Sequence, residues 1–420
     1  MNRSIRAVSG DPSAPAPGRR ESRLLRVGFI PLVDASILIA ASELGHAARE
    51  GLQLDLVRDV SWANVRDRLA FRQFDAAHML APMPVAAQLG LGSNPAPVVT
   101  PFTLGRGGNA ITLSVRIFER MRQEADLADT ADALSCAKAF ARVVARRQAA
   151  GAPPLTLGVT YPFSSHNYEF RYWLAAGGVD PDNDVRLIVV PPPMTTDALA
   201  AGAIDGFCVG APWNMIACER GVGRIVAAKQ DIWPFAPEKV IGLRPDYIKA
   251  NEDTVLRLVQ ALDRAARWCA DPAHHDDLAR ILALPQHLAA PVDILRRVLA
   301  GEFCLDAKGT LRRIEGYFRF HGEGANRPGA PQVLWIYSQM IRWGQVTHSA
   351  AGEALAVSAC RSDLYDAALG QHAERELDPA LIASTRFMDG LVFDPSDVMA
   401  HVAAAGIPRQ VRTVTALPSE

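Results

Sequence analysis

The sequence predicts an α/β fold made of two lobes that face one another across a ligand-binding cleft. Two stretches of nearly the same plan carry this prediction: Asp-Ala-Ala-His-Met-Leu-Ala-Pro-Met at 75–83 and Asp-Gly-Phe-Cys-Val-Gly-Ala-Pro-Trp at 205–213. They lie 130 residues apart (205 − 75 = 130), and each follows a Leu-Ala pair that ends a short helical pattern. Each stretch therefore predicts a helix, a tight turn at Asp and a buried strand that stops at Ala-Pro, because proline cannot continue a sheet ladder.

Two lobes of one plan have a consequence for ligand binding. Open α/β sheets bind ligands at the loops that follow the carboxyl ends of their parallel strands, so two such lobes face to face enclose a site. Asp-to-Pro segments also recur by chance in α/β chains. The match extends into the preceding helix, which favours an internal repeat.

Composition sets the bounds of the fold and of its partners. A chain of 420 residues with 49% hydrophobic and 21% charged residues can bury a large core in two or three domains. The formal net charge is −1, so the chain lacks the basic surplus of a protein that binds nucleic acid directly. Its six cysteines form no CxxC pair, which favours reduced core thiols over a zinc site or a disulfide framework.

The N-terminal segment bears on the compartment. Residues 1–23 are rich in Ser, Pro, Ala, Gly and Arg and contain no uninterrupted apolar run, so we expect a disordered tail and not a secretory signal. The sequence contains no stretch of about 18 uncharged apolar residues of the kind that spans a bilayer. We therefore expect a cytoplasmic protein.

The first lobe is predicted to begin with an apolar strand at 24–32, closed by proline, and an Ala-rich helix at 35–50 that Gly51 ends. A strand at 52–57 follows, and Ser61 can cap the next helix. Trp62 would then lie in the first turn of that helix. It is either a packing anchor or an indole that lines the cleft and donates its N–H to a ligand.

A glycine-rich loop at 105–108 leads into a predicted strand that runs to residue 114. Glycines let backbone N–H groups approach a small anion, but no Gly-Lys-Ser/Thr follows, which argues against a nucleotide. Asn109, at the end of the loop, either offers an amide donor to a ligand or closes a turn.

The second lobe is predicted to follow a long charged helix at 119–150 and a Gly-Ala-Pro-Pro boundary. A strand at 155–160 leads to a turn and a helix near whose N-terminus His166 lies. Helix N-termini favour bound anions, although a capping or core histidine is an equal alternative there. A further strand at 185–190 ends at three consecutive prolines.

A proline- and aromatic-rich segment at 231–240 predicts a stiff crossing between the lobes, where Lys239 is a candidate to place one positive charge in the cleft. Beyond residue 246 the pattern is helical, with amphipathic runs at 255–270, 287–299 and 331–343 and further helical sequence at 377–407. The His-His pair at 274–275 lacks partners at ligand spacing and predicts a surface loop and not a metal site.

Seven motifs give the chain a family resemblance over residues 24 to about 350. It resembles the nitrate-binding proteins of ABC transporters and their cytoplasmic sensor relatives. The motifs are Ser-Trp-Ala-Asn-Val-Arg-Asp (61–67), Asp-Ala-Ala-His-Met-Leu-Ala-Pro-Met-Pro (75–84), Gly-Asn-Ala-Ile-Thr-Leu-Ser (108–114), Arg-Tyr-Trp-Leu-Ala-Ala-Gly-Gly (171–178), Val-Val-Pro-Pro-Pro (189–193), Asp-Gly-Phe-Cys-Val-Gly-Ala-Pro-Trp-Asn (205–214) and Pro-Glu-Lys-Val (237–240).

The resemblance implies a type II clamshell of the periplasmic-binding-protein class with additional C-terminal helices. Lobe I would comprise residues 24–115 with 236–345, lobe II residues 116–235, and a C-terminal helical region at 346–420 would pack on lobe I. The resemblance also implies that nitrate or nitrite is held between the lobes, without a cofactor or metal, by residues matching Trp62, Asn109, His166, Gly210 and Lys239. Transporter members usually carry a glutamine-like donor at the position of Asn109.

This residue set suits a planar, singly charged anion, since one lysine balances the charge while imidazole, indole, amide and backbone donors fix the oxygens. Bicarbonate-binding relatives have an acidic residue in place of the lysine, so Lys239 argues against bicarbonate. Two departures from the transporter members point to the cytoplasmic branch: the missing export signal, and Ala211 where those members tend to have glutamate.

That branch implies a sensor. It sequesters an RNA-binding antiterminator and releases it when the anion binds, because the ligand favours the closed clamshell and the partner the open one. Two alternatives remain: a substrate-binding subunit of a nitrate ABC transporter, and an enzyme related to thiamine-pyrimidine synthases in which Cys208 and His166 would be reactive. No nucleophile, base and orienting acid form a recognisable motif, so we expect no enzyme.

Overall fold

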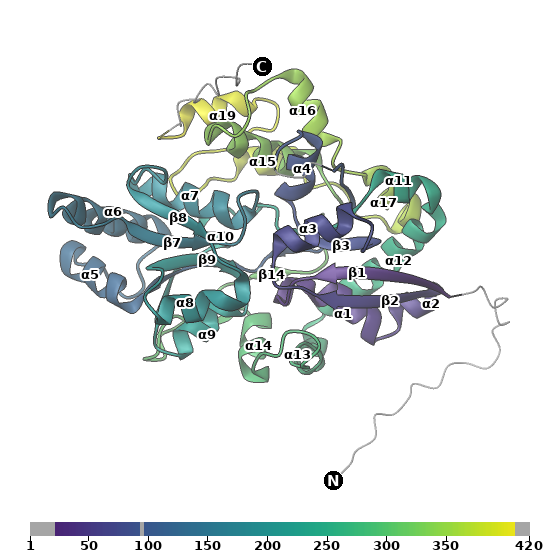
Figure 1. The fold of residues 1–420 in the computed structure, drawn as a ribbon, viewed down its shortest axis with the longest axis horizontal. Coiled ribbons are helices and arrows are strands. Elements are labelled where there is room, and N and C mark those ends of the chain that lie inside the picture. Colours follow the sequence, from purple (N-terminus) through teal and green to yellow (C-terminus); the bar gives the residue numbers. More distant parts are fainter. Residues whose placement is uncertain (1–21, 93–95, 408–420) are drawn as a thin grey trace, which may run out of the picture.

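The computed structural model describes residues 22–92 and 96–407 and places them in two lobes side by side (Figure 1). The first lobe is built on a five-stranded sheet of order β2-β1-β3-β11-β4, in which β11 runs antiparallel to both neighbours. Its strands are β1 (Arg23–Phe29), β2 (Leu52–Arg58), β3 (Ala76–Leu80), β4 (Val99–Thr103) and β11 (Lys239–Leu243).

The second lobe repeats this plan. Its sheet has the order β8-β7-β9-β6-β10, and β6 is antiparallel to both β9 and β10. The strands are β6 (Asn109–Ser114), β7 (Leu155–Val159), β8 (Val185–Val189), β9 (Gly206–Gly210) and β10 (Gly223–Ala228). The strand order is therefore the same in both sheets. The parallel strands β2-β1-β3 correspond to β8-β7-β9, the antiparallel strand β11 corresponds to β6, and the edge strand β4 corresponds to β10. The predicted pair of α/β lobes of one plan is confirmed.

The two aspartates that begin the repeated stretches have the same structural role. The side chain of Asp75 accepts a hydrogen bond from the backbone N–H of Arg26 at 2.9 Å, and that of Asp205 accepts one from Thr156 N–H at 2.9 Å. The acceptors are 130 residues apart, and so are the donors (156 − 26 = 130). Each aspartate therefore ties the strand that follows it to the first strand of its own sheet.

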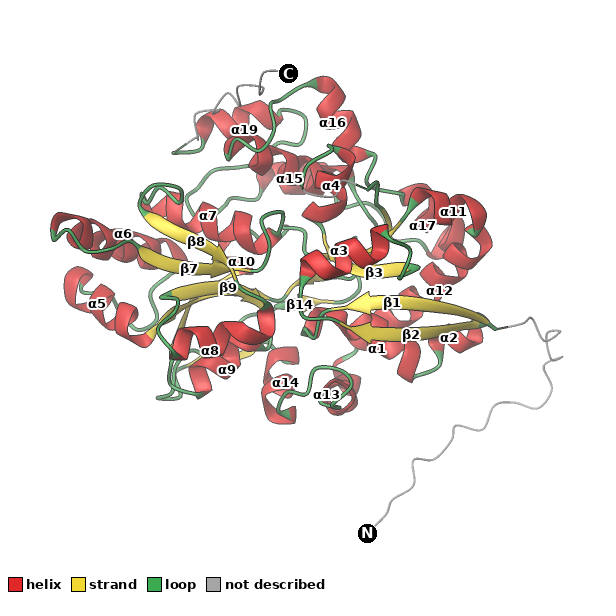
Figure 2. Ribbon diagram, viewed as in Figure 1, coloured by secondary structure: helices red, strands yellow, loops and turns green. Residues whose placement is uncertain are grey.

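Helices cover both sheets and extend beyond them (Figure 2). The helices of the first lobe and its extension are α1 (Ser36–Glu43), α2 (His46–Arg49), α3 (Trp62–Ala70), α4 (Pro82–Gln88), α11 (Pro245–Ala250), α12 (Glu252–Ala270), α13 (His275–Leu282) and α14 (Val292–Leu299). The second lobe has α5 (Val115–Ala125), α6 (Ala133–Ala149), α7 (Ser165–Gly177), α8 (Thr195–Ala200), α9 (Trp213–Glu219) and α10 (Lys229–Ile232). Five more follow: α15 (Ala330–Arg342), α16 (Ala350–Val357), α17 (Ser362–Leu369), α18 (Pro379–Ser384) and α19 (Val398–Ala404).

Two predicted long helices are each divided in the structure. The helix expected at 35–50 consists of α1 and α2, because Gly45 adopts a left-handed conformation (φ 72°) between them. The helix expected at 119–150 consists of α5 and α6; Asp126 (φ 49°) ends the first and Asp132 caps the second. The predicted all-helical pattern after residue 246 missed the short strands β12 (Glu302–Cys304), β13 (Leu311–Arg313) and β14 (Phe318–Arg319).

The glycine-rich loop at 105–108 crosses between the lobes and packs against a distant segment. A Cβ atom at Gly107 would lie 1.8 Å from the carbonyl oxygen of Tyr317, so glycine is required for this close approach. The loop contains β5 (Arg106–Gly107), which pairs with β14. The second sheet begins at Asn109, whereas the sequence assigned residues up to 115 to lobe I.

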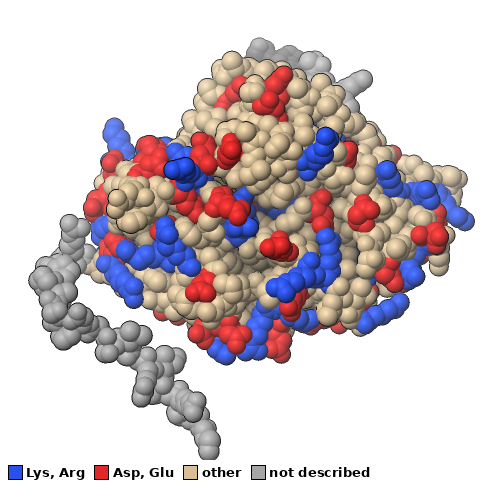
Figure 3. Space-filling view, turned by 180° about the vertical axis from the view of Figure 1, so that it is seen from behind, with Lys and Arg blue, Asp and Glu red and all other residues tan. Residues whose placement is uncertain are grey.

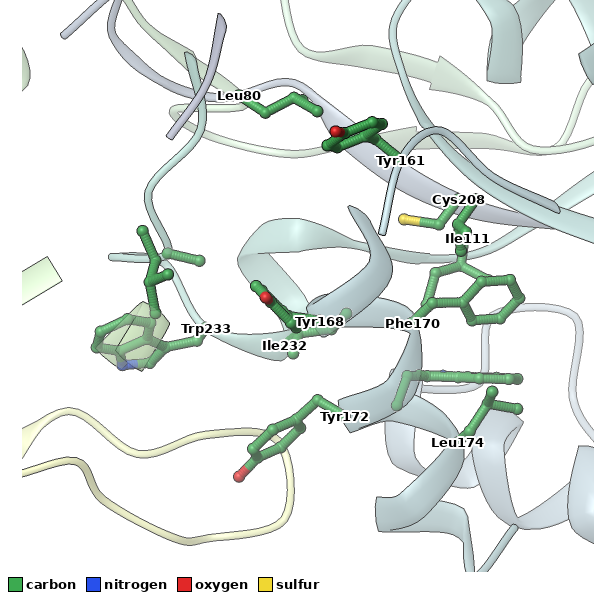
Figure 4. Packing of buried hydrophobic residues seen from close by; sticks show 14 of the residues in the cluster. Leu80, Ile111, Tyr161, Tyr168, Phe170, Tyr172, Leu174, Cys208, Ile232 and Trp233 are labelled. Atoms are coloured by element: carbon green, nitrogen blue, oxygen red, sulfur yellow. The ribbon is translucent and has the colours of Figure 1, made fainter. Parts of the chain in front are cut away.

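The C-terminal region contacts both lobes. Helix α16 packs against α4, and α17 packs against α12 and β4, all in the first lobe. Phe387, however, stacks on Tyr172 of α7 (ring centroids 4.9 Å apart) and on Trp233 (4.7 Å), both from the second lobe. Figure 4 shows Tyr172 and Trp233 among the buried side chains of this core. The C-terminal region therefore packs on lobe I, as expected, and contacts lobe II as well.

All six cysteines are free, as predicted. In the part of the chain that the structure describes, no helix has the length and apolar character needed to cross a membrane. Lys, Arg, Asp and Glu are interspersed on the face drawn in Figure 3, in keeping with the net charge of −1. Most of the predicted tail, residues 1–21, lies outside the described residues.

We expect Asp75→Ala to lower the free energy of unfolding by about 1–2 kcal/mol, because it leaves the Arg26 N–H without its acceptor. Asp55→Ala is the matched control. Asp55 forms a largely exposed ion pair with Arg26, and its loss should change stability by no more than about 0.5 kcal/mol. Urea unfolding monitored by circular dichroism measures both, and equal effects would contradict the assigned role of Asp75.

Candidate functional site

The structure brings together all five residues that the sequence singled out. Lys239 begins β11 and lies in register with Leu80, the last residue of β3. Asn109 begins β6 and lies in register with Gly210, the last residue of β9. Trp62 and His166 come from the first turns of α3 and α7. The five meet where the carboxyl ends of the two sheets face each other, and each is buried.

Lys239 is fully buried and held between two carboxylates. Its Nζ lies 2.8 Å from Asp34 Oδ2 and also pairs with Glu238, the preceding residue. Burial favours the neutral amine, but Asp34 and Glu238 outweigh it and raise the pKa of Lys239. Burial likewise opposes ionisation of Asp34, yet Lys239 and His78 keep its pKa below the usual value. Lys239 is thus a cation in the core of the molecule.

Asn109 connects the lysine to a second charged pair. Its Nδ2 donates to Glu169 Oε2 at 3.0 Å and also to Glu238 Oε2. Lys229 Nζ lies 2.9 Å from Glu238 and 3.5 Å from Glu169. We call the set that surrounds Lys239 the buried charge cluster; it comprises Asp34, His78, Asn109, His166, Glu169, Lys229, Glu238 and Lys239.

The two histidines of the cluster are neutral. Burial, reinforced by Lys239, lowers the pKa of His166 to about 3. Burial also lowers the pKa of His78, against the opposing effect of Asp34, whose Oδ1 is 3.0 Å from His78 Nε2. The ring of His166 is oriented by Thr160, whose Oγ1 lies 3.1 Å from Nδ1. Its Nε2 faces Glu238 at 3.8 Å, beyond hydrogen-bond distance.

Glu169 and Glu238 differ in charge although they share Asn109 and Lys229. Burial raises the pKa of Glu169 to about 7, and Lys229 only partly offsets this. Burial opposes ionisation of Glu238 as well, but Lys229 and Lys239 overcome it and lower its pKa. The pair therefore combines one carboxylate with a lowered pKa and one whose pKa, about 7, lies near neutral pH.

Several polar atoms at the site are buried without a hydrogen-bond partner among the described residues. They include the indole Nε1 of Trp62 and the amide Oδ1 of Asn109. The Trp62 ring also lies 5.7 Å from Lys239 Nζ and packs edge-on against His78 at 5.2 Å. A buried donor without a hydrogen-bond partner costs about 1–3 kcal/mol of folding free energy. The indole N–H beside a lysine is therefore suited to donate a hydrogen bond to a ligand oxygen.

Contacts between the lobes close the site. A Cβ atom at Gly210 would lie 3.1 Å from Asp34 Oδ2, so the absence of a side chain lets the second lobe approach the first. The backbone N–H of Val33 donates to Ala211 O at 2.9 Å, and Arg66 Nη1 donates to the Tyr161 hydroxyl at 2.6 Å. The structure is therefore a closed clamshell.

Sequence reasoning missed the carboxylates and one of the two lysines. Glu238 and His78 stand inside the quoted motifs, and Asp34 follows the first strand of its sheet as His166 follows the first strand of the other. Their positions in the sequence could therefore have marked these three residues as candidates for the site. Glu169 and Lys229 had no local signal, because they reach Glu238 only through the packing of α7 and α10.

A reactive cysteine and a metal site have weaker support in the structure. Burial raises the pKa of Cys208 well above its usual value, which disfavours a thiolate nucleophile. The predicted loop at 274–275 begins α13, where the His274 ring stacks on Trp268 at 4.6 Å. Within the described residues, no group of three or more His, Cys, Asp or Glu side chains is arranged to hold a metal ion.

A family model described as the NMT1-like family matches residues 18–283. The chain belongs to this family. It is 33% identical to the nitrate import ATP-binding protein NrtC of Synechocystis, over 99% of this chain and 60% of that protein. It is also 33% identical to the bicarbonate transport ATP-binding protein CmpC of Synechococcus elongatus, over 92% and 55%. The chain thus spans little more than half the length of these two relatives.

Other relatives match over nearly their full length. The nitrate/nitrite binding protein NrtA of Synechococcus elongatus is 31% identical, over 96% of this chain and 91% of that protein. The crystal structure of the periplasmic nitrate-binding protein NrtA from Synechocystis superposes with a TM-score of 0.82 at 26% identity, covering 92% of this chain and 99% of that one. The predicted periplasmic-binding-protein clamshell is confirmed, and these relatives are binding and transport proteins.

The pKa of Glu169 predicts how stability depends on pH. Its value in the folded protein, about 7, is above the ordinary 4.5, so its contribution is greatest at low pH and is lost as pH rises through 7. Glu169→Gln should therefore gain stability relative to the wild type, by up to about 3 kcal/mol, between pH 5 and pH 8. Urea unfolding at four pH values measures the difference, and parallel curves for the two proteins would contradict it.

Removal of Lys239 should destabilise the fold. Lys239→Met leaves Asp34 and Glu238 buried without their shared cation, which typically costs about 3–5 kcal/mol. Lys249→Met, at an exposed position of α11, is the control and should be nearly neutral. Thermal and urea unfolding test both. A Lys239→Met protein as stable as the control would show that the ion pairs are not formed in solution.

Proposed function

We propose that this chain binds nitrate or nitrite between its lobes and acts as a cytoplasmic sensor for a partner protein. The observation that carries the anion assignment is the juxtaposition of a buried lysine with an unpaired indole N–H, an imidazole and the ends of two sheets. Relatives named as nitrate/nitrite binding proteins match over 83–91% of their length.

The chemistry of the donors supports a small monovalent anion. Lys239 supplies charge without a fixed bonding direction, whereas Trp62 Nε1 supplies a directional donor. The first turn of α7 adds the positive end of a 13-residue helix at His166. An anion oxygen near Lys239 would take the place of a carboxylate oxygen that the lysine contacts, such as Asp34 Oδ2.

Bicarbonate is the competing ligand, because a bicarbonate transport protein is among the relatives. Its hydroxyl could donate to a carboxylate of the cluster. Lys239 favours nitrate, since nitrate has only acceptor atoms and a planar shape that several donors can share. The name of the relative NrtC also mentions ATP, but this chain contains no Gly-Lys-Ser/Thr motif, so we do not extend nucleotide binding to it.

The sensor role extends the anion proposal to a partner. In this role the open clamshell holds an RNA-binding antiterminator, and closure on the anion releases it, because each ligand stabilises a different state. Ala211, which stands at a lobe contact where transporter members tend to have glutamate, supports this branch. A substrate-binding subunit of a nitrate ABC transporter agrees with the same relatives and is the second candidate.

Calorimetric titration of the purified full-length chain with nitrate, nitrite and bicarbonate is the first test. Repeating it with a candidate antiterminator, followed by size-exclusion chromatography, separates the two roles. Nitrate or nitrite that dissociates a complex supports the sensor. Anion binding without any complex favours transport, and no anion binding would refute the assignment of the site.

Trp62→Phe tests the indole donor. It should weaken nitrate affinity about 10- to 100-fold, the worth of a hydrogen bond to a charged group, and the stability lost should be only that of the smaller buried ring, because Nε1 has no hydrogen-bond partner among the described residues. Trp335→Phe is the matched control: Trp335 is equally buried, its Nε1 is also unpaired among the described residues, and it lies on α15 outside the site. Equal nitrate affinities in the two variants would exclude Trp62 from binding.

A further inference from the structure

The charges of the buried cluster do not balance once an anion is added. Asp34, Glu169 and Glu238 contribute three negative charges when ionised, and Lys229 and Lys239 contribute two positive charges. His78 and His166 are neutral. The side chains of the cluster therefore sum to −1, and a monovalent anion would bring the sum to −2 with almost no solvent to screen the charge.

Among the three carboxylates of the cluster, Glu169 is the one whose negative charge is least compensated by nearby cations. It lies 3.5 Å from Lys229, whereas Glu238 lies 2.9 Å from the same ammonium and also pairs with Lys239. Its Oε1 has no hydrogen-bond partner among the described residues, while Oε2 accepts from Asn109. Protonation of Oε1 therefore breaks no hydrogen bond, and it removes a negative charge whose nearest cation, Lys229, is 3.5 Å away and is shared with Glu238.

From this geometry, and resting on the proposed function, we propose that the site takes up one proton together with its anion and that Glu169 holds the proton. The proton comes from solvent and adds to a carboxylate oxygen, so the neutral acid and the bound anion together leave the cluster at −1. Glu169 thus determines how strongly the anion binds at a given pH. The side chain need not touch the anion.

Groups from several elements around Glu169 bear on its protonation. The pKa of Glu169, about 7, places the change within reach of ordinary buffers, and a further negative charge nearby raises this pKa. The groups that interact with Glu169 are Asn109 on β6, Cys208 on β9, Lys229 on α10, Glu238 and Lys239 at the start of β11, and Tyr317 before β14.

Proton uptake is measured by titrating the full-length protein with sodium nitrate at pH 8 in buffers of different ionisation enthalpy. We expect the wild type to take up a sizeable fraction of one proton for each anion, with affinity falling by up to about tenfold for each pH unit above 7. Glu169→Gln should bind nitrate with no proton uptake and with nearly constant affinity from pH 6.5 to 8.5. Asp263→Asn, which neutralises a buried carboxylate paired with Arg267 on α12, should behave as the wild type.

The outcomes separate this inference from the proposed function. Nitrate binding without proton uptake in the wild type would overturn the inference and leave the anion site standing. Uptake that persists in Glu169→Gln would move the proton to another group, such as His166, and overturn the assignment. Failure of nitrate to bind at any pH from 6 to 9 would overturn both. The wild-type proton count decides whether a proton is taken up even if the Gln variant does not fold, and an apparent pKa of nitrate binding far from 7 in the wild type would then overturn the assignment to Glu169.

Discussion

The closed clamshell depends on the compensation of charges that both lobes bury at their contact. Lys239 from the first lobe sits between Asp34 and Glu238, and Asn109 and Glu169 from the second lobe meet the same carboxylate. Isolated charges cannot be buried at this depth, so each is retained only because another neutralises it. Closure, charge balance and ligand affinity are consequently one linked equilibrium.

The repeated architecture explains why the site lies where it does. Each sheet places its third strand beside an antiparallel strand that crosses from the other lobe, β11 in one and β6 in the other. The first residue of each crossing strand, Lys239 or Asn109, therefore stands at the carboxyl end of the third strand. Both residues are held by hydrogen-bonded sheets, so each half of the site is positioned by its own lobe.

The C-terminal region stabilises the helix that carries His166. Tyr172 on α7 donates to Asp389 at 2.9 Å and stacks on Phe387, and Arg171 on the same helix lies over Trp343. Aromatic and cation contacts of this kind add to the burial of α7. The second lobe is therefore linked to helices that also pack on the first lobe.

The sequence by itself determined the class of fold and the internal repeat at 130 residues, and its resemblance to nitrate-binding proteins supplied the five site residues that the structure brings together. The fold class and the repeat depend on local signals: alternation of apolar residues, prolines that end strands, an Asp that closes each turn, and a capping serine before Trp62. The two predicted long helices also divide for a local reason, the backbone conformation at Gly45 and Asp126, but helix propensity alone does not predict where they divide.

Only the tertiary structure decided the electrostatics of the site. Glu169 and Lys229 are 60 residues apart in the chain, and neither has a motif around it (229 − 169 = 60). Their effect on Glu238 depends on distances of 3.5 and 2.9 Å and on the exclusion of water, which no sequence pattern reports. Residue types indicate that a cleft can hold an anion, but the protonation states of the side chains in that cleft depend on which buried charges the fold places side by side.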